Sequence, residues 1–161
     1  MSLNKQFAKH FKDFHFGPSL TGSSLKETLD GVDWHVATAR VDGLNTIAML
    51  VFHIHYYVGA VLKVLKGGAL DAHDKYSYNM PEIRSEEDWQ KMLRQYITEA
   101  TEFADLVESM PEAQLKELMA LEKYGNWFQN LLVLQEHSYY HLGQIVLIKK
   151  ILSQPQVSTG G

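Results

Sequence analysis

The sequence predicts an all-α protein built as a four-helix bundle. Four stretches carry apolar residues at helical spacing, between residues that typically start and stop helices. A strand is indicated only by a weak alternation over residues 35–41. With 161 residues, 45% of them apolar, the chain is long enough to bury a core of its own. We therefore expect one domain over residues 1–153, followed by a disordered tail, 154–161.

The first expected helix spans about residues 3–16. Its leucine and phenylalanines recur at spacings of four, four and three, which places them on one face. Gly17, which precedes a proline, ends this helix. The segment up to residue 44 is expected to be a loop, except where Ser24 and Glu27 form a capping box for one or two helical turns.

The second expected helix begins with Asn45 as its N-cap and ends at Gly67. It is apolar almost all round, so it belongs at the centre of the bundle. The span 46–65 is also nearly long enough to cross a bilayer. His53 and His55 lie near its middle, however, and polar groups at that depth of a membrane are costly. We therefore expect a buried core helix and no membrane span.

The third and fourth expected helices fill the C-terminal half of the chain. The third starts after Ser85, with three acidic residues in the first turn where they suit the helix dipole, and stops before Pro111. The fourth is capped by Asn126 and continues to about Leu152. The connector 66–84 is longer than a hairpin between antiparallel helices needs, so the second and third helices are free to run parallel.

The amino-acid composition excludes several kinds of site and partner. The chain has no cysteine, which excludes disulfides, thiolate metal sites and a cysteine nucleophile of its own. Lys and Arg number 15 against 19 Asp and Glu, for a formal charge of -4, and no basic cluster stands out. This balance argues against nucleic acid or an anionic membrane as the main partner. The N-terminal segment lacks the apolar core of a signal peptide, so we expect a cytoplasmic protein.

Histidines carry the strongest functional signal. His137 and His141 are four residues apart within the fourth helix, so they point the same way and can share one metal ion. A third ligand must come from another helix, and His53, mid-way along the apolar second helix, is the best candidate. His55 is turned about 200° from His53 and cannot join it on one ion. His10 is a candidate fourth ligand or pocket residue. The alternative is a hydrogen-bonded core pair without metal.

Several other residues are assigned supporting roles. Asn130 and Gln144 lie seven residues on either side of His137, on its face, where they are expected to orient the ligands. Gly143 in mid-helix indicates close helix packing or access to a pocket, because glycine costs about 1 kcal/mol there relative to alanine. His15, at the end of the first helix, is expected to be incidental.

Two segments resemble a known family. The stretches NTIAMLVFHIHYYVGAVLKVLKGG and EHSYYHLGQIVLIKKIL resemble the DinB/YfiT-like superfamily. This resemblance implies a DinB-like four-helix bundle in up-down-down-up order, and places a three-histidine metal site on His53, His137 and His141. It also implies a homodimer, zinc or nickel as the metal, and chemistry with low-molecular-weight thiols. Sites with three imidazoles also accept iron or manganese.

The leading functional hypothesis is a metal-dependent transferase that acts on a small molecule with a low-molecular-weight thiol as cosubstrate. Because the chain has no cysteine, a thiolate nucleophile must arrive with that cosubstrate. One alternative is a metal-dependent hydrolase, although Ser138, Tyr139 and Tyr140 stand where an HExxH helix carries its general base. The other is a non-catalytic, stress-linked protein that binds a metal or small molecule.

Overall fold

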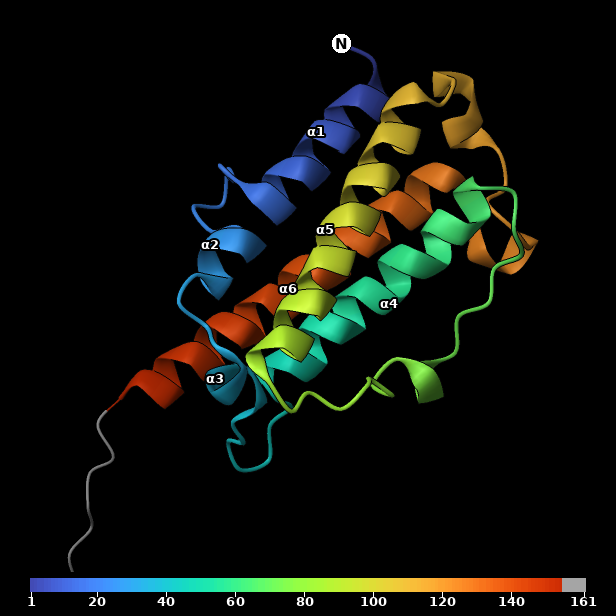
Figure 1. Ribbon diagram of the computed structural model, residues 1–161. Helices are drawn as coiled ribbons and strands as arrows, with labels where there is room; N and C mark the ends of the chain where they lie inside the picture. Colours follow the sequence, from blue (N-terminus) through green and yellow to red (C-terminus); the bar gives the residue numbers. More distant parts are fainter. Residues whose placement is uncertain (155–161) are drawn as a thin grey trace, which may run out of the picture.

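The computed structural model describes residues 1–154 and confirms an all-α protein (Figure 1). Within this described part no residue belongs to a strand; a single isolated bridge joins Leu118 and Asn126. Beyond residue 154, the tail that was expected to be disordered lies outside the described residues.

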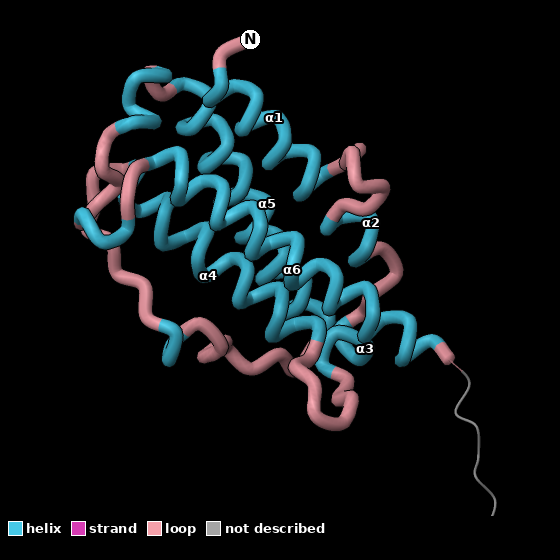
Figure 2. Tube along the Cα trace, turned by 180° about the vertical axis from the view of Figure 1, so that it is seen from behind, coloured by secondary structure: helices cyan, strands magenta, loops and turns pink. Residues whose placement is uncertain are grey.

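Four long helices form the body of the molecule: α1 (Leu3–Phe16), α4 (Ile47–Leu65), α5 (Glu86–Ser109) and α6 (Trp127–Ser153). Two short helices fill the first connector: α2 (Leu25–Leu29) and α3 (Trp34–Thr38). Three 3-10 turns lie in the later connectors: η1 (Asp74–Tyr76), η2 (Glu112–Lys116) and η3 (Glu122–Tyr124). Figure 2 shows the long loops that join these elements around the outside of the bundle.

Most of the predicted helix boundaries hold. The capping box of Ser24 opens α2, Ser85 caps α5 and Asn126 caps α6. The prediction of Asn45 as N-cap was wrong by one residue, because the hydroxyl of Thr46 accepts the hydrogen bond from the backbone N–H of Met49.

The weak strand signal over residues 35–41 was also wrong. This segment begins with the helix α3, whose first turn is capped by the Asp33 carboxylate accepting from the backbone N–H of Val36 at 2.9 Å. An N-cap bond of this kind satisfies an otherwise unpaired amide and favours the helical conformation. The helix ends at Thr38, and the chain then becomes extended at Ala39.

Contacts between the long helices fix their directions. At the start of α1, the Asn4 side chain donates to the carbonyl of Met110, just after the end of α5, at 2.9 Å, so these two helices are antiparallel. Along α4, His55 faces Tyr96 of α5 and Lys66 pairs with Glu102 further on, so these two run parallel. Figure 1 shows α1 and α6 running opposite to α4 and α5. The long connector after α4 makes the parallel pair feasible.

Helix α4 is the core helix of the bundle. By length and composition alone it could cross a membrane, but 61% of its most apolar window is buried inside the protein. It contacts α5 on one side and α6 on the other. Its buried residues contribute to both hydrophobic clusters of the core, with Leu50 and Ile54 in one and Val58 and Leu62 in the other. The two histidines in the middle of this helix, His53 and His55, are therefore buried inside the protein.

Candidate metal centre

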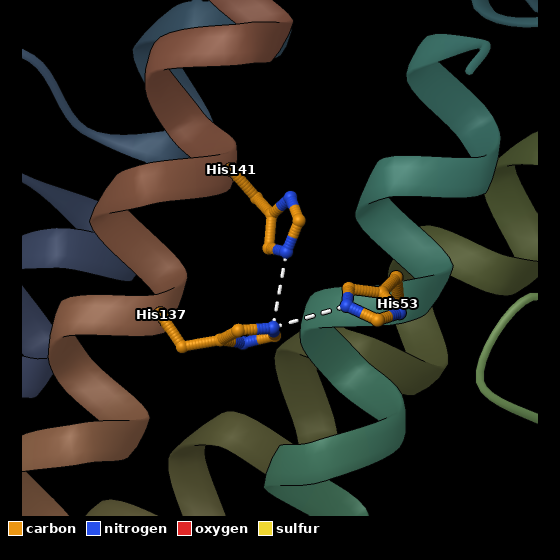
Figure 3. A group of neighbouring side chains, drawn as sticks. All are labelled: His53, His137 and His141. Atoms are coloured by element: carbon orange, nitrogen blue, oxygen red, sulfur yellow. Dashed lines mark hydrogen bonds between the residues drawn. The ribbon is translucent and has the colours of Figure 1, made fainter. Parts of the chain in front are cut away.

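Three histidines converge between α4 and α6 (Figure 3). His53 comes from the middle of α4, and His137 and His141 come from successive turns of α6. The Nε2 atom of His137 lies 3.0 Å from Nε2 of His53 and 3.0 Å from Nε2 of His141. The candidate ligand atoms all lie within 4.8 Å of one another. The structure thus brings together the three residues that the sequence singled out.

Oxygen atoms behind two of the rings determine which nitrogen carries the proton. Nδ1 of His53 lies 3.3 Å from the carbonyl oxygen of Ser77, and Nδ1 of His141 lies 2.7 Å from Oε1 of Gln144. Because these oxygens only accept hydrogen bonds, each Nδ1 must be the donor. In a neutral imidazole Nε2 then has a free lone pair, and both lone pairs face His137.

The third ring cannot satisfy both of these lone pairs. Nε2 of His137 can carry at most one proton. In at least one of its two close nitrogen contacts, therefore, two lone pairs face each other with no proton between them. Its Nδ1 is buried and has no hydrogen-bond partner. Three inward-facing imidazole nitrogens, two of them on rings with an oxygen acceptor behind them, are an arrangement that suits a divalent cation. The donor set therefore fits a metal ion better than it fits a hydrogen-bonded core cluster.

The protonation state agrees with this fit. Burial lowers the pKa of His137 to about 4, with further lowering from the neighbouring His141 and His53. Burial also lowers the pKa of His53, followed by the effect of His141, and burial lowers the pKa of His141. All three rings are therefore neutral at pH 7, which is the form that binds metals.

The connector after α4 supplies one wall of the centre. The ring of Tyr78 stacks on the ring of His53, with centroids 4.1 Å apart and planes 9° from parallel. Ser77 contributes the carbonyl behind His53, and its hydroxyl donates to the backbone carbonyl of Asp74 at 2.8 Å. The connector thus both orients one ligand and covers it.

Tyr57 and Asp74 form a polar pair beside the cluster. Tyr57 lies one turn after His53 on α4, and its ring is 4.9 Å from that of His137. Its hydroxyl donates a short hydrogen bond to the Asp74 carboxylate. Burial, and then this bond, raise the pKa of Tyr57 to about 12, so its proton remains in place at neutral pH. The negative charge of Asp74 also reaches His53 and His137, where it partly opposes the effect of burial on their pKa values.

A cavity of about 680 Å³ opens beside the three histidines, and we call it the histidine cavity. His53 and His137 form part of its wall, and Asp74 supplies its one carboxylate. Within the described chain, its lining contains no lysine or arginine. Most other walls are apolar, among them Val61, Leu70, Met119, Val133 and Leu134. This volume lies in the usual range for small-molecule sites.

Other predicted site residues lie elsewhere. His55 points to the opposite side of α4, where its ring stacks on Tyr96, as its helical position required. His10 lies outside the cluster and faces Tyr139, with ring centroids 5.8 Å apart, so it is not a fourth ligand.

The supporting residues divide between confirmed and wrong predictions. Gln144 orients His141 as expected. Asn130 lines the histidine cavity, but its amide donates to the carbonyls of Tyr124 and Asn126, each at 2.8 Å, so it holds the start of α6 and orients no ligand. For Gly143 the sequence left close helix packing or access to a pocket open. An added Cβ there would meet nothing within 4 Å, which rules out the close packing, and Gly143 does not line the histidine cavity.

Sequence reasoning missed the residues around the ligands. Tyr57 was within reach, because a residue four positions after His53 on a helix must share its face. Ser77, Asp74 and Tyr78 lie in an irregular connector without periodicity, and only the folded chain places them against α4.

Comparison with known proteins gave no match: no family model matches the chain, and neither a curated protein nor a solved structure matches it. The structure by itself establishes an all-α bundle with a buried cluster of three histidines.

Proposed function

We propose that the protein binds one divalent metal ion through Nε2 of His53, His137 and His141. The observation that carries this proposal is the convergence of three neutral imidazole nitrogens, two of them oriented by oxygen acceptors at Nδ1. Zinc or nickel is the expected metal, and iron or manganese also suits three nitrogen ligands. The DinB/YfiT-like resemblance of the sequence points to the same three residues, and the helix directions are those that it implies.

The proposed activity is that of a metal-dependent transferase acting on a small molecule, with a low-molecular-weight thiol as cosubstrate. A divalent cation held by three neutral ligands lowers the pKa of a water molecule or thiol beside it, and so provides a nucleophile near neutral pH. The histidine cavity offers room for a small molecule next to that position. Its largely apolar walls favour a substrate with an apolar body.

Asp74 is the proposed proton acceptor in this reaction. Its carboxylate is the negative group that lines the histidine cavity, and it is held by the hydroxyl of Tyr57. A proton released from a nucleophile at the histidine cluster would pass to the Asp74 carboxylate, while Tyr57 keeps that carboxylate in position. General bases of this kind contribute typically 10²–10⁴-fold to a rate.

The same carboxylate favours a metal-dependent hydrolase as the second candidate. The segment between His137 and His141 contains no acidic residue, and in a hydrolase Asp74 would take the place of the glutamate of HExxH proteins. The two candidates differ in the nucleophile, which is a thiol in one and water in the other. Turnover of an electrophile that requires added thiol supports the transferase, and turnover without thiol supports the hydrolase.

The proposed partner is a second copy of this chain, which makes the protein a homodimer. The proposed location is the cytoplasm. Six apolar side chains of α6 project outward and are 37% to 65% exposed: Phe128, Leu132, Val133, Tyr140, Leu147 and Ile151. Gly143 lies within the same face, and the space above it is open. A glycine at such a position lets another backbone approach closely. Exposed apolar faces of this kind typically mark interaction sites.

Elemental analysis of the purified protein tests the metal proposal. We expect near-stoichiometric metal in the wild-type protein, and loss of that metal in both His53→Ala and His141→Ala. His35→Ala is the matched control, because His35 is exposed on α3 and belongs to no cluster. Full retention of metal in either ligand variant would remove that residue from the site. Metal binding without turnover across a panel of thiol conjugations and hydrolyses would leave a non-catalytic, stress-linked binding protein.

A further inference from the structure

A second cavity of about 390 Å³ lies on the other side of α4, away from the three metal-site histidines. It is lined by α1, α2, α4 and α5 together with the loop after α2, and is open to solvent at one side. Its walls are largely apolar, among them Leu25, Leu29, Val32, Val51 and Leu93. Charged side chains such as Lys26 and Glu86 also border it, but they are exposed to solvent.

Three wall residues of this second cavity carry buried polar atoms that have no hydrogen-bond partner. These atoms are Nε2 of His15, Nδ1 of His55 and the hydroxyl oxygen of Tyr96. Their rings are close to one another. The ring centroids of His55 and Tyr96, which are stacked, are 3.4 Å apart, and those of His15 and His55 are 5.9 Å apart. An unpaired buried polar group costs about 1–3 kcal/mol, so three in one place call for a missing partner.

The hydrogen-bonding character of two of these atoms is fixed. Nδ1 of His15 lies 3.0 Å from the carbonyl oxygen of Phe11 and must donate to it. Burial lowers the pKa of His15 to about 4, so at pH 7 the ring is neutral and its Nε2 is an acceptor. Burial raises the pKa of Tyr96, so its hydroxyl keeps its proton and is a donor. The missing partner therefore needs one donor and one acceptor.

We propose that the second cavity binds a small neutral alcohol or phenol, whose hydroxyl donates to His15 and accepts from Tyr96. A hydroxyl offers one donor and two acceptor positions in a single atom, which matches both wall residues. The apolar walls then contact the hydrocarbon body of the ligand. An apolar cavity of about 150 Å³ already holds benzene, so the second cavity has room for a substituted ring. A charged ligand is disfavoured, because the buried polar groups here are neutral.

This site is separate from the proposed metal centre and does not depend on it. His53 and His55 are two residues apart on α4 and point to opposite sides of it, so α4 contributes a different histidine to each cavity. A protein without metal is therefore expected to bind the alcohol or phenol as well as the metal-loaded protein does.

Binding of p-cresol and of toluene to the full-length protein tests the proposal, by titration calorimetry with and without a chelator. The two probes have similar shapes, and only p-cresol has a hydroxyl. We expect p-cresol to bind with a stoichiometry of one and about 30-fold more tightly than toluene, the effect of two net hydrogen bonds. Amide shifts in an NMR titration should fall on residues 25–32 and 93–97, which border the second cavity.

Variants then assign the hydrogen bonds. Tyr96→Phe and His15→Phe should each lower the affinity for p-cresol about fivefold, because each removes one of its two hydrogen bonds. His35→Phe, the same substitution at an exposed histidine, should not change it. Equal affinity of the wild-type protein for both probes, no binding of either, or shifts confined to the histidine cavity would each overturn the proposal. Even if a variant fails to fold, the comparison of the two probes on the wild-type protein shows whether the second cavity recognises the hydroxyl.

Discussion

Acid should destabilise this protein through His15, and the effect can be worked out from the structure. The ring is buried, and its pKa in the folded protein is about 4, against an ordinary value of 6.5. As the pH falls below 6.5, the unfolded chain takes up a proton at this position, while the folded protein does not until about pH 4. The unfolded state therefore gains protons first, and the free energy of unfolding falls through this window.

The size of the effect follows from the same two pKa values. A difference of about 2.5 pKa units at about 1.36 kcal/mol each corresponds to about 3 kcal/mol of stability lost between pH 7 and pH 4. This is a large share of the 5–15 kcal/mol that typically stabilises a domain. Replacing His15 with phenylalanine removes the titrating group, so the variant should lose about 3 kcal/mol less than the wild-type protein over this range.

Urea unfolding followed by circular dichroism at several values between pH 7 and pH 4 measures this difference. A chelator in every sample removes any contribution from metal binding. The three metal-site histidines titrate in both proteins, so their effect largely cancels in the comparison. His55 lies next to His15, which contributes to the lowering of its pKa, so the acid sensitivity due to His55 also decreases in the variant. His35→Phe is the control, and its pH dependence should follow the wild type. If His15→Phe and wild type lose stability in parallel, the assignment of acid sensitivity to His15 is wrong.

Three further predictions concern the metal centre and the dimer. Gln144→Ala should weaken metal affinity about 10- to 100-fold in a chelator competition, because His141 loses the acceptor that orients it; unchanged affinity would contradict that role. Asp74→Asn should retain stoichiometric metal by elemental analysis but lower turnover at least 10²-fold, whereas undiminished turnover would show that another group accepts the proton. Leu147→Glu places a charge on the outward face of α6 and should give a monomer in sedimentation velocity, with an unchanged helical spectrum; a persistent dimer would place the interface elsewhere.

Helical features were predictable wherever the sequence itself carries the determining contacts. The bounds of α1 follow from its apolar spacing and from Gly17, and the start of α6 follows from the Asn126 cap. At the start of α4, Asn45 and Thr46 are both suitable N-caps, and the sequence alone does not choose between them.

The candidate site was predictable only in part, for a physical reason. The pairing of His137 with His141 is a local property of helix geometry. Ser77 and Asp74 reach the site through the path of an irregular connector, which no periodicity encodes. His15, which was expected to be incidental, lies outside the three-histidine cluster, but its burial was not predictable, because it comes from the packing of α2 and α4 against the end of α1.

The position of His53 and His55 on a single helix has a mechanical consequence. Any rotation of α4 about its axis moves both imidazoles together, one relative to α6 and the other relative to the ring of Tyr96. Helix α4 is thus a common wall of the histidine cavity and the second cavity. Because α4 packs against α5 on one side and against α6 on the other, its setting is fixed, and each cavity keeps its shape whether or not the other is occupied.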